Sequence, residues 1–397
     1  MPTLFPDRRI PNGRKIRVAW LLTPVTYGMG GTWKHVSNWA RGFDRERFEC
    51  CLFFCPTAPE KEQAIMEHFA GFPGLVVIPV RGLYPVSRWI QGGLLELYAA
   101  LKNWKPDILH SIFLQSDIAA ALVGRRAGIQ VHISSWESDP CYWLSPGWKY
   151  PLNNLGFNYS KRRIDRVIVI TSHMRRLGID RFRIPASRIS QVPVGLPLED
   201  FPRRKNVEIC ERPSRSIRIG TIARLSPEKL VDTIIRAIPL VLKVFPDARF
   251  IIAGDGPEKS RLEQLAADLG VGLSTEFIGW QTDIGSVLQN LDIFLFTSRA
   301  EGLPLAVLEA QAAMVPTIAS SVGGVPDIIR NGENGLLLSS AAPEELSTLL
   351  LRLIGDRLLA SSLAENGRKV FESRFLLDIE MARIQDIYLE LWERAYS

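Results

Sequence analysis

Two basic residues stand close together in a segment that reads as a strand-to-helix turn. Arg224 and Lys229 lie in the run Ala223–Lys229, after an apolar segment and before an amphipathic one. Arginine forks onto phosphate oxygens and lysine supplies a compact positive charge, so the pair suits a diphosphate. A helix N-terminus is itself partly positive and disfavours cations, which makes ligand binding a better explanation of their position than ordinary surface charge.

A second loop, residues 298–310, combines acidic residues with a glycine and a proline. Gly302 allows the backbone to approach a ligand closely, and Pro304 suits the first position of a helix. The amides near this helix start are therefore expected to bind an anion. Glu301 precedes the helix, whereas Glu309 lies about 7.5 Å further along its axis. The two carboxylates are predicted to bind hydroxyl groups at opposite ends of a nucleotide diphosphate-sugar.

The setting of Glu309 supports that role. Its neighbours in the expected helix are apolar, which predicts a largely buried helix and does not fit an ordinary solvent-exposed glutamate.

Three glycine turns give weaker signals. The turn 254–257 reads as structural, the turn 321–327 suits ligand approach or geometry equally, and Gly30 with Gly31 could present amides to a phosphate.

The elements needed to position these loops follow from the alternation of apolar and amphipathic segments. Expected helices cover 31–43, 228–244, 257–269 and 304–314. Expected strands cover 16–22, 48–54, 75–79, 108–111, 131–134 and 166–171, then 217–222, 248–253, 276–278, 292–297, 315–319 and 335–338. Strands that are apolar throughout predict an α/β fold with parallel sheets covered on both faces.

The chain is expected to form two Rossmann-like domains, residues 1–200 and 201–375, facing each other across a deep cleft. The segment 198–216 is rich in proline and charge and has no periodicity, which is typical of a linker. The last amphipathic segment, 376–397, could pack in the second domain or return to the first. The residues leave both arrangements open.

Composition, cysteine count and net charge indicate which class of protein this is. The 397 residues are 46% hydrophobic and 23% charged, as in a soluble globular protein. No apolar run is long enough for a transmembrane helix and no signal peptide is recognisable, so a cytoplasmic protein is expected. Five cysteines without a metal or redox spacing predict no disulfide framework. The net charge is +6, with the excess of cations in residues 1–200, which predicts an anionic partner for that half.

Aromatic and basic residues adjoin in the first half. Aromatic side chains are frequent over 141–159, and Lys161, Arg162 and Arg163 follow. This combination suits an anionic membrane interface or a polyprenyl-phosphate acceptor. The alternative is that the aromatics pack inward beneath a solvated basic rim. No nucleic-acid recognition motif accompanies the charge, so nucleic acid is not expected as a partner.

The order of these pieces resembles the retaining glycosyltransferases of family 4, which have the GT-B fold. The resemblance rests on Arg224 with Lys229, on Glu301-Gly302-Leu303-Pro304, and on Glu309 after a gap of seven residues. It implies a metal-independent hexosyltransferase-type enzyme that needs no cofactor beyond its nucleotide-sugar substrate, with UDP or GDP as the nucleotide. Transfer to a glycan or a lipid-linked acceptor in polysaccharide, lipopolysaccharide or glycolipid assembly, at the inner face of the cytoplasmic membrane, is the implied function.

The resemblance also implies roles for individual residues. Arg224, Lys229 and Glu301 would be catalytic, with the two cations neutralising the leaving diphosphate. Glu309 would hold the ribose. The remaining donor contacts would come from the N-terminal glycine pair, the turn that seats the nucleobase and the loop that holds the sugar: Gly30, Gly31, Gly279, Trp280, Gly302, Leu303, Pro304 and Leu305.

Three positions depart from the family pattern. Trp136, followed by Glu137 on the acceptor side, stands where the family often has a histidine, and Leu230 replaces a usual glycine. Thr32-Trp33 replaces an acidic residue after the glycine pair. A catalytically silent sugar-nucleotide-binding or scaffolding relative is therefore an alternative. A dinucleotide-dependent oxidoreductase is a further alternative, but neither half contains the required GxGxxG with a ribose-binding acid.

Overall fold

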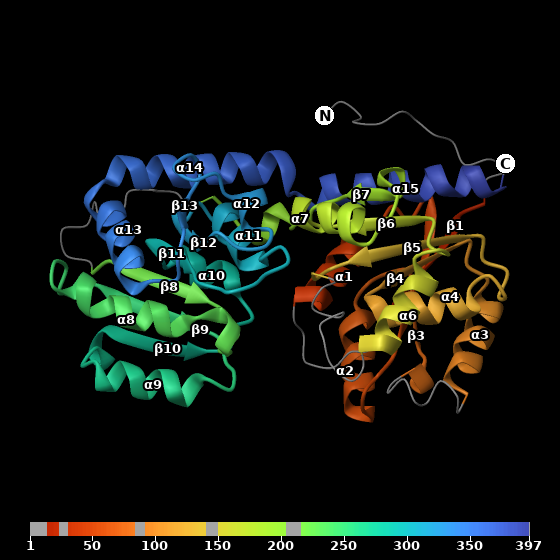
Figure 1. Ribbon diagram of the computed structural model, residues 1–397, viewed down its shortest axis with the longest axis horizontal. Helices are drawn as coiled ribbons and strands as arrows, with labels where there is room; N and C mark the ends of the chain where they lie inside the picture. The colour runs from red at the N-terminus through yellow and green to blue at the C-terminus, as the bar shows by residue number, and fades with distance from the viewer. Residues whose placement is uncertain (1–13, 24–30, 84–91, 140–149, 204–215, 397) are drawn as a thin grey trace. The chain divides into compact units, whose positions relative to one another are not determined.

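The chain divides into two compact units. The computed structural model describes residues 14–23, 31–83, 92–139, 150–203 and 216–396. Unit 1 comprises residues 1–170, 174–192 and 381–397, and unit 2 comprises 171–173 and 193–380. Each unit is a parallel sheet with helices around it (Figure 1). The predicted class, two Rossmann-like α/β domains, is confirmed.

Unit 1 contains a seven-stranded parallel sheet in the order β3-β2-β1-β4-β5-β6-β7. The strands are β1 (Ile16–Leu22), β2 (Phe48–Phe54), β3 (Leu75–Pro79), β4 (Ile108–Ile112), β5 (Val131–Trp136), β6 (Arg166–Val169) and β7 (Ile189–Gln191). The helices are α1 (Gly31–Gly42), α2 (Pro59–Ala70), α3 (Gly93–Trp104), α4 (Leu114–Val123), α6 (Tyr150–Ser160) and the greater part of α15 (Leu377–Tyr396).

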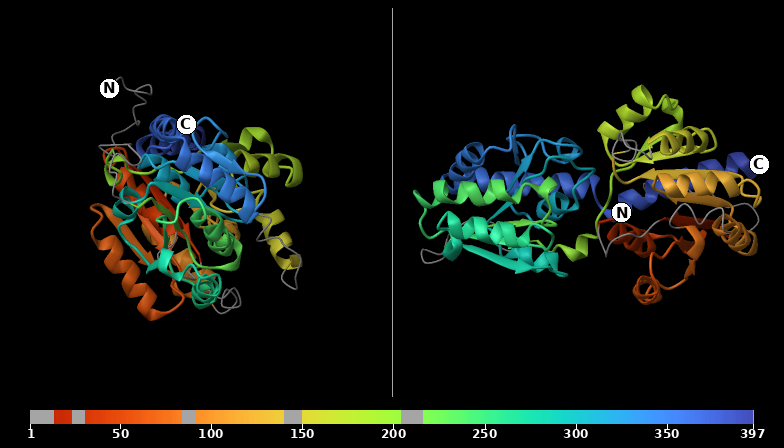
Figure 2. Two further views of the ribbon diagram at one scale, coloured as in Figure 1. Left: turned by 90° about the vertical axis from the view of Figure 1, so that its left-hand side faces the viewer. Right: turned by 60° about the horizontal axis from the view of Figure 1, so that its bottom comes forward.

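The alternation along β1 shows why both faces of this sheet are apolar. Ala19 and Leu21 belong to a core that α3 and α4 complete, whereas the Trp20 ring between them contacts Trp39 of α1. Successive side chains of a strand point to opposite faces, so a strand covered on both sides must be apolar throughout. Two further views show helices on both sides of the sheets (Figure 2).

Unit 2 contains a six-stranded parallel sheet in the order β10-β9-β8-β11-β12-β13. The strands are β8 (Arg218–Ile222), β9 (Arg249–Ala253), β10 (Thr275–Gly279), β11 (Ile293–Phe296), β12 (Thr317–Ser320) and β13 (Leu336–Leu338). The helices are α8 (Val231–Leu242), α9 (Lys259–Asp268), α10 (Ile284–Gln289), α11 (Leu305–Ala312), α12 (Val325–Ile328), α13 (Pro343–Gly355) and α14 (Arg357–Arg374). A large apolar core lies beneath α8, α9 and α13.

Both units have the Rossmann strand order 3-2-1-4-5-6, and unit 1 adds a seventh strand. Most predicted strands are present within one or two residues of their expected bounds. The short strand β7 was not predicted, because three residues carry too little pattern. None of the described helices is both long and apolar enough to cross a membrane.

The junctions between units follow from specific contacts. Residues 171–173, which begin α7 (Ser172–Arg176), group with unit 2, since the Ser172 amide and hydroxyl each donate to the Asp327 carboxylate over 2.6 Å. The chain passes from unit 1 to unit 2 between Val192 and Pro193, and residues from Met381 onward rejoin unit 1. The predicted linker falls largely on 204–215, outside the described residues.

Candidate functional site

The charged loops of unit 2 lie at the point where its strand order reverses. β8 and β11 are neighbours in the sheet, yet β8 continues to β9 on one side and β11 to β12 on the other. In open α/β sheets, ligands bind beyond the carboxyl ends of the strands at such a switch point. The loop after β8 carries Arg224 and Lys229, and the loop after β11 carries Glu301.

An ion pair joins these two loops. Lys229 Nζ lies 2.5 Å from Glu301 Oε1, and the Ser298 hydroxyl donates to the same oxygen over 2.7 Å. The Lys229 and Glu301 side chains retain 22% and 12% of their surface exposure, respectively, so both remain partly accessible. The cation and the carboxylate are therefore held in one place without being sealed from solvent.

Further hydrogen bonds hold the two loops together. The Thr297 hydroxyl donates to the backbone carbonyls of Lys229 and Leu230 over 3.0 and 3.1 Å. The Ser298 hydroxyl and the Arg299 amide donate to the Glu228 carbonyl over 3.1 and 2.8 Å. The position of Lys229 is thus fixed by the end of β11 as well as by its own turn.

A helix was predicted over 228–244, directly after the first loop. The structure instead places a short turn before the helix. Pro227–Lys229 form one 3₁₀ turn, Leu230 adopts a left-handed conformation with φ 49°, and α8 begins at Val231. A leucine in this conformation costs about 1–2 kcal/mol relative to a right-handed one. The Thr297 hydroxyl bond to Leu230 offsets part of that cost, and the break turns the Lys229 side chain toward Glu301.

Glu228 remains ionised beside the two cations. Burial alone would raise the pKa of its carboxyl, but a hydrogen bond from the Ser226 hydroxyl and the charges of Lys229 and Arg224 lower the pKa below its ordinary value. The Ser226 Oγ to Glu228 Oε1 distance is 2.5 Å. This residue was missed as a site neighbour in the sequence, where it is only one letter between Pro227 and Lys229.

The turn 254–257 supports the Arg224 loop, in agreement with its structural interpretation. Gly254 and Gly256 have φ of +133° and +159°, and a Cβ on either would overlap a carbonyl oxygen of the loop after β8. The Leu225 amide donates to the Asp255 carbonyl over 2.9 Å. Leu225 is buried, whereas Arg224 is exposed. The two glycines therefore let the turn lie close enough to anchor this loop while Arg224 extends outward.

The second loop enters α11 at Leu305. Pro304 is the N-cap residue with φ −74° and ψ 112°, so the helix begins one position later than predicted. Leu303 is buried, Gly302 and Leu305 are partly buried, and Glu309 is only 5% exposed in a helix whose one other polar residue is Gln311. The first amides of a helix have no intrahelical acceptors, so this end of α11 can bind an anion.

The turn 321–327 packs against that loop. A Cβ on Gly323 would overlap the Glu301 carbonyl oxygen, and one on Gly324 would overlap the Gly302 carbonyl oxygen. The Gly324 amide donates to the Gly302 carbonyl over 2.8 Å. The sequence left open whether this turn serves ligand approach or backbone geometry. The contacts favour geometry, because both glycines allow the close backbone contact that positions Glu301.

Gly279 and Trp280 lie at the end of β10. Gly279 has φ +68°, and its carbonyl accepts a hydrogen bond from the Gly254 amide over 2.7 Å. The Trp280 side chain is 62% exposed. This turn is linked through Gly254 to the Arg224 loop, so an exposed aromatic ring and the two cations belong to one edge of the sheet.

Unit 1 holds the remaining predicted residues. Gly31 is exposed at the start of α1, and Gly30 lies outside the described residues. Trp136 is buried, with its ring centroid 6.0 Å from that of Phe157 and 5.8 Å from that of Phe182. Its ring thus packs in a buried aromatic cluster of unit 1.

Glu137 follows β5 and pairs with His35, a histidine that no sequence motif singled out. His35 Nδ1 lies 2.7 Å from Glu137 Oε2, and both side chains are buried. The two residues are 102 positions apart, so no spacing motif could have joined them. Both lie at the carboxyl edge of the sheet of unit 1.

The three basic residues after α6 have different environments. Lys161 turns inward, where its ammonium donates to the Phe182 carbonyl over 3.1 Å, and burial together with the charge of Arg162 lowers its pKa. The Arg163 guanidinium lies 3.7 Å from the centroid of the Tyr159 ring, and Arg162 is exposed. Only the two arginines are therefore available as surface cations.

The edge of unit 2 is equipped for a ligand that combines anionic and hydroxyl groups. It offers two cations, the amides at the start of α11, two carboxylates and an exposed indole. Among the described residues, no group of three or more histidine, cysteine or acidic side chains is placed to hold a metal ion.

Comparison with known proteins identifies the family. Residues 29–200 match the family model described as Glycosyltransferase Family 4, and residues 202–370 match the model described as Glycosyl transferases group 1. The chain is 33% identical over 327 residues to the GDP-mannose-dependent monoacylated alpha-(1-6)-phosphatidylinositol monomannoside mannosyltransferase of Corynebacterium glutamicum, covering 77% of this chain and 84% of that one.

Two further relatives agree. The chain is 26% identical over 311 residues to the UDP-Gal:alpha-D-GlcNAc-diphosphoundecaprenol alpha-1,3-galactosyltransferase of Escherichia coli, covering 75% of this chain and 79% of the other. The crystal structure of HepE from Anabaena in complex with UDP has the same fold, with a TM-score of 0.78 and 18% identity over 94% of this chain and 100% of that one. This chain belongs to glycosyltransferase family 4 and is a glycosyltransferase of the GT-B fold.

Proposed function

We propose that the enzyme transfers a sugar from a nucleoside-diphosphate sugar to a saccharide or lipid-linked acceptor, with retention of anomeric configuration and without a metal ion. The observation that carries this proposal is the 2.5 Å Lys229–Glu301 ion pair at the switch point of unit 2. Exposed Arg224 on the same loop adds the second cation. Two positive charges match the charge that a departing diphosphate develops.

The roles of the side chains follow from this placement. Lys229 and Arg224 stabilise the diphosphate as its bond to the anomeric carbon breaks, and they supply the charge that a divalent cation supplies in other transferases. The acceptor oxygen bonds to that carbon on the face from which the diphosphate departs, and its proton passes to the departing phosphate oxygen. Glu301 accepts hydrogen bonds from sugar hydroxyls, and no protein nucleophile is required.

The donor nucleotide is proposed from the relatives and from the edge of unit 2. The names of the two enzymes compared above specify UDP-galactose and GDP-mannose as donors. We therefore propose UDP or GDP here, with Glu309 holding the ribose, the exposed Trp280 turn seating the base, and the Gly302–Leu305 backbone holding the sugar.

The acceptor and the place of reaction are proposed on similar grounds. The E. coli relative is named for a diphosphoundecaprenol-linked acceptor and the Corynebacterium relative for a phosphatidylinositol mannoside. Both names describe lipids, so we propose a lipid-linked acceptor met at the cytoplasmic face of the membrane. Glu137, held by His35 at the carboxyl edge of unit 1, is the proposed contact for an acceptor hydroxyl.

A thermal-shift titration against UDP, GDP, ADP, CMP and NAD tests the donor site. One nucleoside diphosphate should raise the melting temperature of the wild type, and Glu309→Ala should lose that shift. The control is Glu263→Ala, an exposed acidic position on α9. A shift with NAD alone, or an equal shift in Glu309→Ala, would refute the proposed site.

The stereochemistry and the metal requirement need a separate measurement. Transfer from the nucleotide sugar identified by the titration should proceed in EDTA, and NMR of the product should show the anomeric configuration of the donor. An inverted product would overturn the retaining mechanism. Loss of transfer in EDTA that added Mg²⁺ restores would overturn metal independence.

A further inference from the structure

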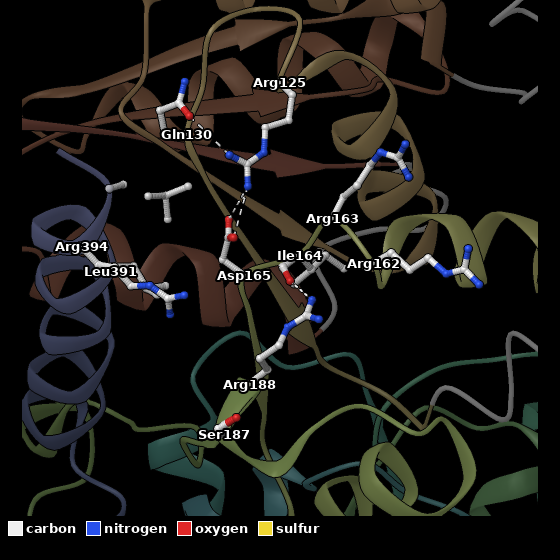
Figure 3. A pocket seen from close by; sticks show the side chains of 12 residues that line it. Arg125, Gln130, Arg162, Arg163, Ile164, Asp165, Ser187, Arg188, Leu391 and Arg394 are labelled. Atoms are coloured by element: carbon white, nitrogen blue, oxygen red, sulfur yellow. Dashed lines mark hydrogen bonds and ion pairs between the residues drawn. The ribbon is translucent and has the colours of Figure 1, made fainter.

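A basic pocket lies at the amino edge of the sheet of unit 1. Its volume is about 540 Å³. Val131, Asp165 and Arg188 line it at the starts of β5, β6 and β7, and the last turns of α15 complete the lining (Figure 3). Pockets that bind small molecules have volumes of roughly 300–1,000 Å³, so this one can accommodate a small ligand.

The pocket is separate from the edge that binds substrates in this fold. Substrates of open parallel sheets bind beyond the carboxyl ends of the strands, where Gly31 and Glu137 lie in unit 1. The pocket residues that belong to the sheet region instead lie just before β6 and β7 or at the first residue of β5. Transfer chemistry at the carboxyl edges therefore does not account for it.

Five arginines line this pocket and only one acidic residue does. The arginines are Arg125, Arg162, Arg163, Arg188 and Arg394, and the acid is Asp165. The Asp165 carboxylate already has two partners: it accepts from Arg125 over 3.2 and 3.3 Å and from the His132 amide over 2.8 Å. The lining therefore has a large excess of positive charge.

Internal contacts hold two of the arginines in place. Arg188 donates to the carbonyls of Lys161, over 2.8 Å, and Ile164, which fixes it between β6 and β7. Arg163 stacks on the Tyr159 ring. These bonds orient the guanidinium groups but leave their charge unneutralised, because a carbonyl or a ring carries no negative charge.

Arg125 is paired with Asp165, whereas Arg162 and Arg394 have no such internal contacts within the described residues. Arg394 extends from α15 toward the starts of the strands, and Arg162 lies on the opposite rim (Figure 3). Both are exposed, and within the described part of the chain neither forms an ion pair. One cation in the last turn of a helix is ordinary. Helix stability gives no reason to bring four more arginines to the same pocket, where their charges repel one another.

We propose that this pocket binds a phosphate group, either of a small phosphorylated molecule or of an anionic phospholipid headgroup. Guanidinium groups bind phosphate through paired, charge-assisted hydrogen bonds, and several of them around one cavity neutralise a doubly charged group. The proposal rests on unit 1 alone and is independent of the donor site of the proposed function.

Two probes distinguish the two sources of phosphate. Calorimetric titration with glycerol 3-phosphate measures the soluble ligand. Co-sedimentation with phosphatidylcholine vesicles, with and without phosphatidylglycerol, measures the headgroup. The test variant is Arg162→Gln with Arg394→Gln, chosen because neither side chain holds the fold together. The control is Lys61→Gln with Lys102→Gln, two exposed lysines of unit 1 that give the same change in net charge.

The test variant should bind at least one probe about tenfold or more weakly, because two charge-assisted contacts are lost. The control pair should bind as the wild type does. Loss of glycerol 3-phosphate binding alone identifies a soluble ligand, and loss of phosphatidylglycerol-dependent sedimentation identifies a lipid. Equal binding of both probes by the test variant and the control pair would overturn the proposal.

The donor site is tested separately by Glu309→Ala. This variant should bind glycerol 3-phosphate and vesicles like the wild type, since Glu309 belongs to unit 2. If the proposal for the pocket is wrong, the nucleotide titrations remain as expected. If the proposal for the donor site is wrong, the titrations of the pocket remain as expected.

Discussion

The two units share a strand order but differ in where they keep their polar side chains. In unit 1 the neighbouring strands β4 and β5 carry His110, Ser111, His132, Ser134 and Ser135, all of them buried. In unit 2 the equivalent strand β11 is wholly apolar, its neighbour β12 carries only Thr317 and Ser320 as polar residues, and the charged residues gather beyond the end of β11. One topology thus supports two arrangements, a polar interior and a polar edge.

The polar interior of unit 1 forms a connected network. Ser134 donates to the Asp117 carboxylate over 2.8 Å, Ser111 donates to its other oxygen, and Ser111 also contacts His132 over 2.9 Å. Burial raises the pKa of Asp117 to about 7 against the lowering effect of both serines. Buried polar groups that satisfy one another specify a single packing, because any other arrangement would leave some of them unpaired.

A second set of buried hydrogen bonds, on the opposite face of the same strands, secures the last helix. His110 lies 2.5 Å from the Tyr388 hydroxyl and 2.7 Å from that of Ser135, and the Trp20 indole donates to Tyr388 over 3.3 Å. The difference between the units teaches that a polar group in the middle of the sheet serves the fold, whereas one at the carboxyl edge is available to a ligand. Four predictions test this division.

The largest expected effect comes from the edge of unit 2. Lys229→Ala or Arg224→Ala should reduce kcat/KM by about 10²–10³-fold, because the leaving group loses a preorganised positive charge. The free energy of unfolding should change by no more than about 1 kcal/mol, since the ion pair is partly exposed. Steady-state kinetics and urea unfolding measure both, with Lys243→Ala, an exposed lysine, as the control. Near wild-type activity in either variant would remove it from the catalytic set.

The next effect comes from the interior of unit 1. Asp117→Ala should lower the free energy of unfolding by about 3 kcal/mol, because the hydroxyls of Ser111 and Ser134 lose their buried partner. Asp117→Asn keeps the shape and should cost about 1 kcal/mol, because a carboxyl with a pKa of about 7 is already partly neutral. Equal losses in the two variants would contradict a specific network.

A pair of glycines separates backbone strain from close packing. Gly323 and Gly270 have φ of +52° and +70°, but a Cβ on Gly323 would overlap the Glu301 carbonyl, whereas one on Gly270 would meet open space. Gly270→Ala should cost about 1 kcal/mol. Gly323→Ala should cost about 2 kcal/mol more and lower kcat/KM by about tenfold or more, because it displaces Glu301. Similar results for both would show that this turn does not position the site.

The smallest effect is a pH dependence confined to unit 1. Burial lowers the pKa of both His110 and His132 to about 3, so below about pH 6.5 the unfolded chain gains two protons that the native state does not bind. Asp117 offsets one of them, because between about pH 7 and pH 4 its carboxyl is protonated in the native state but ionised in the unfolded chain. Stability should therefore fall by about 1.4 kcal/mol per pH unit as pH decreases from about 6 to about 4.

Tryptophan fluorescence measures this dependence selectively, because every tryptophan except Trp280 belongs to unit 1. Denaturant titrations at pH 6 and pH 5 give the slope. Asp117→Asn should roughly double it, because the opposing proton of Asp117 is removed. A slope that stays flat in the wild type and in Asp117→Asn would exclude buried neutral histidines as its cause.

Much of this architecture could be predicted from local patterns. Apolar runs such as β1 and β2 were predicted with their observed bounds, since a strand buried on both faces must be apolar along its whole length. The break at Leu230 was not predictable. A leucine disfavours a left-handed conformation, and the Thr297 hydroxyl that helps to hold it comes from 67 positions away.

The final helix shows the same limit. The amphipathic pattern of 376–397 indicated a buried face but not the surface that buries it. Tyr388 decides this by contacting His110 and Trp20, which lie 278 and 368 positions earlier. The buried position of Trp136 was not predictable either, because its aromatic partners Phe157 and Phe182 belong to later segments of the chain.

The sequence by itself determined the strand–helix alternation and the chemistry of each loop, because hydrophobic period and residue type are local properties. Only the tertiary structure decided which loops meet. Lys229 and Glu301 are 72 positions apart, His35 and Glu137 are 102 apart, and the five arginines of the basic pocket come from four separate segments. Parallel sheets bring distant strand ends to one edge, and the order of the strands, which no local pattern encodes, determines which residues gather there.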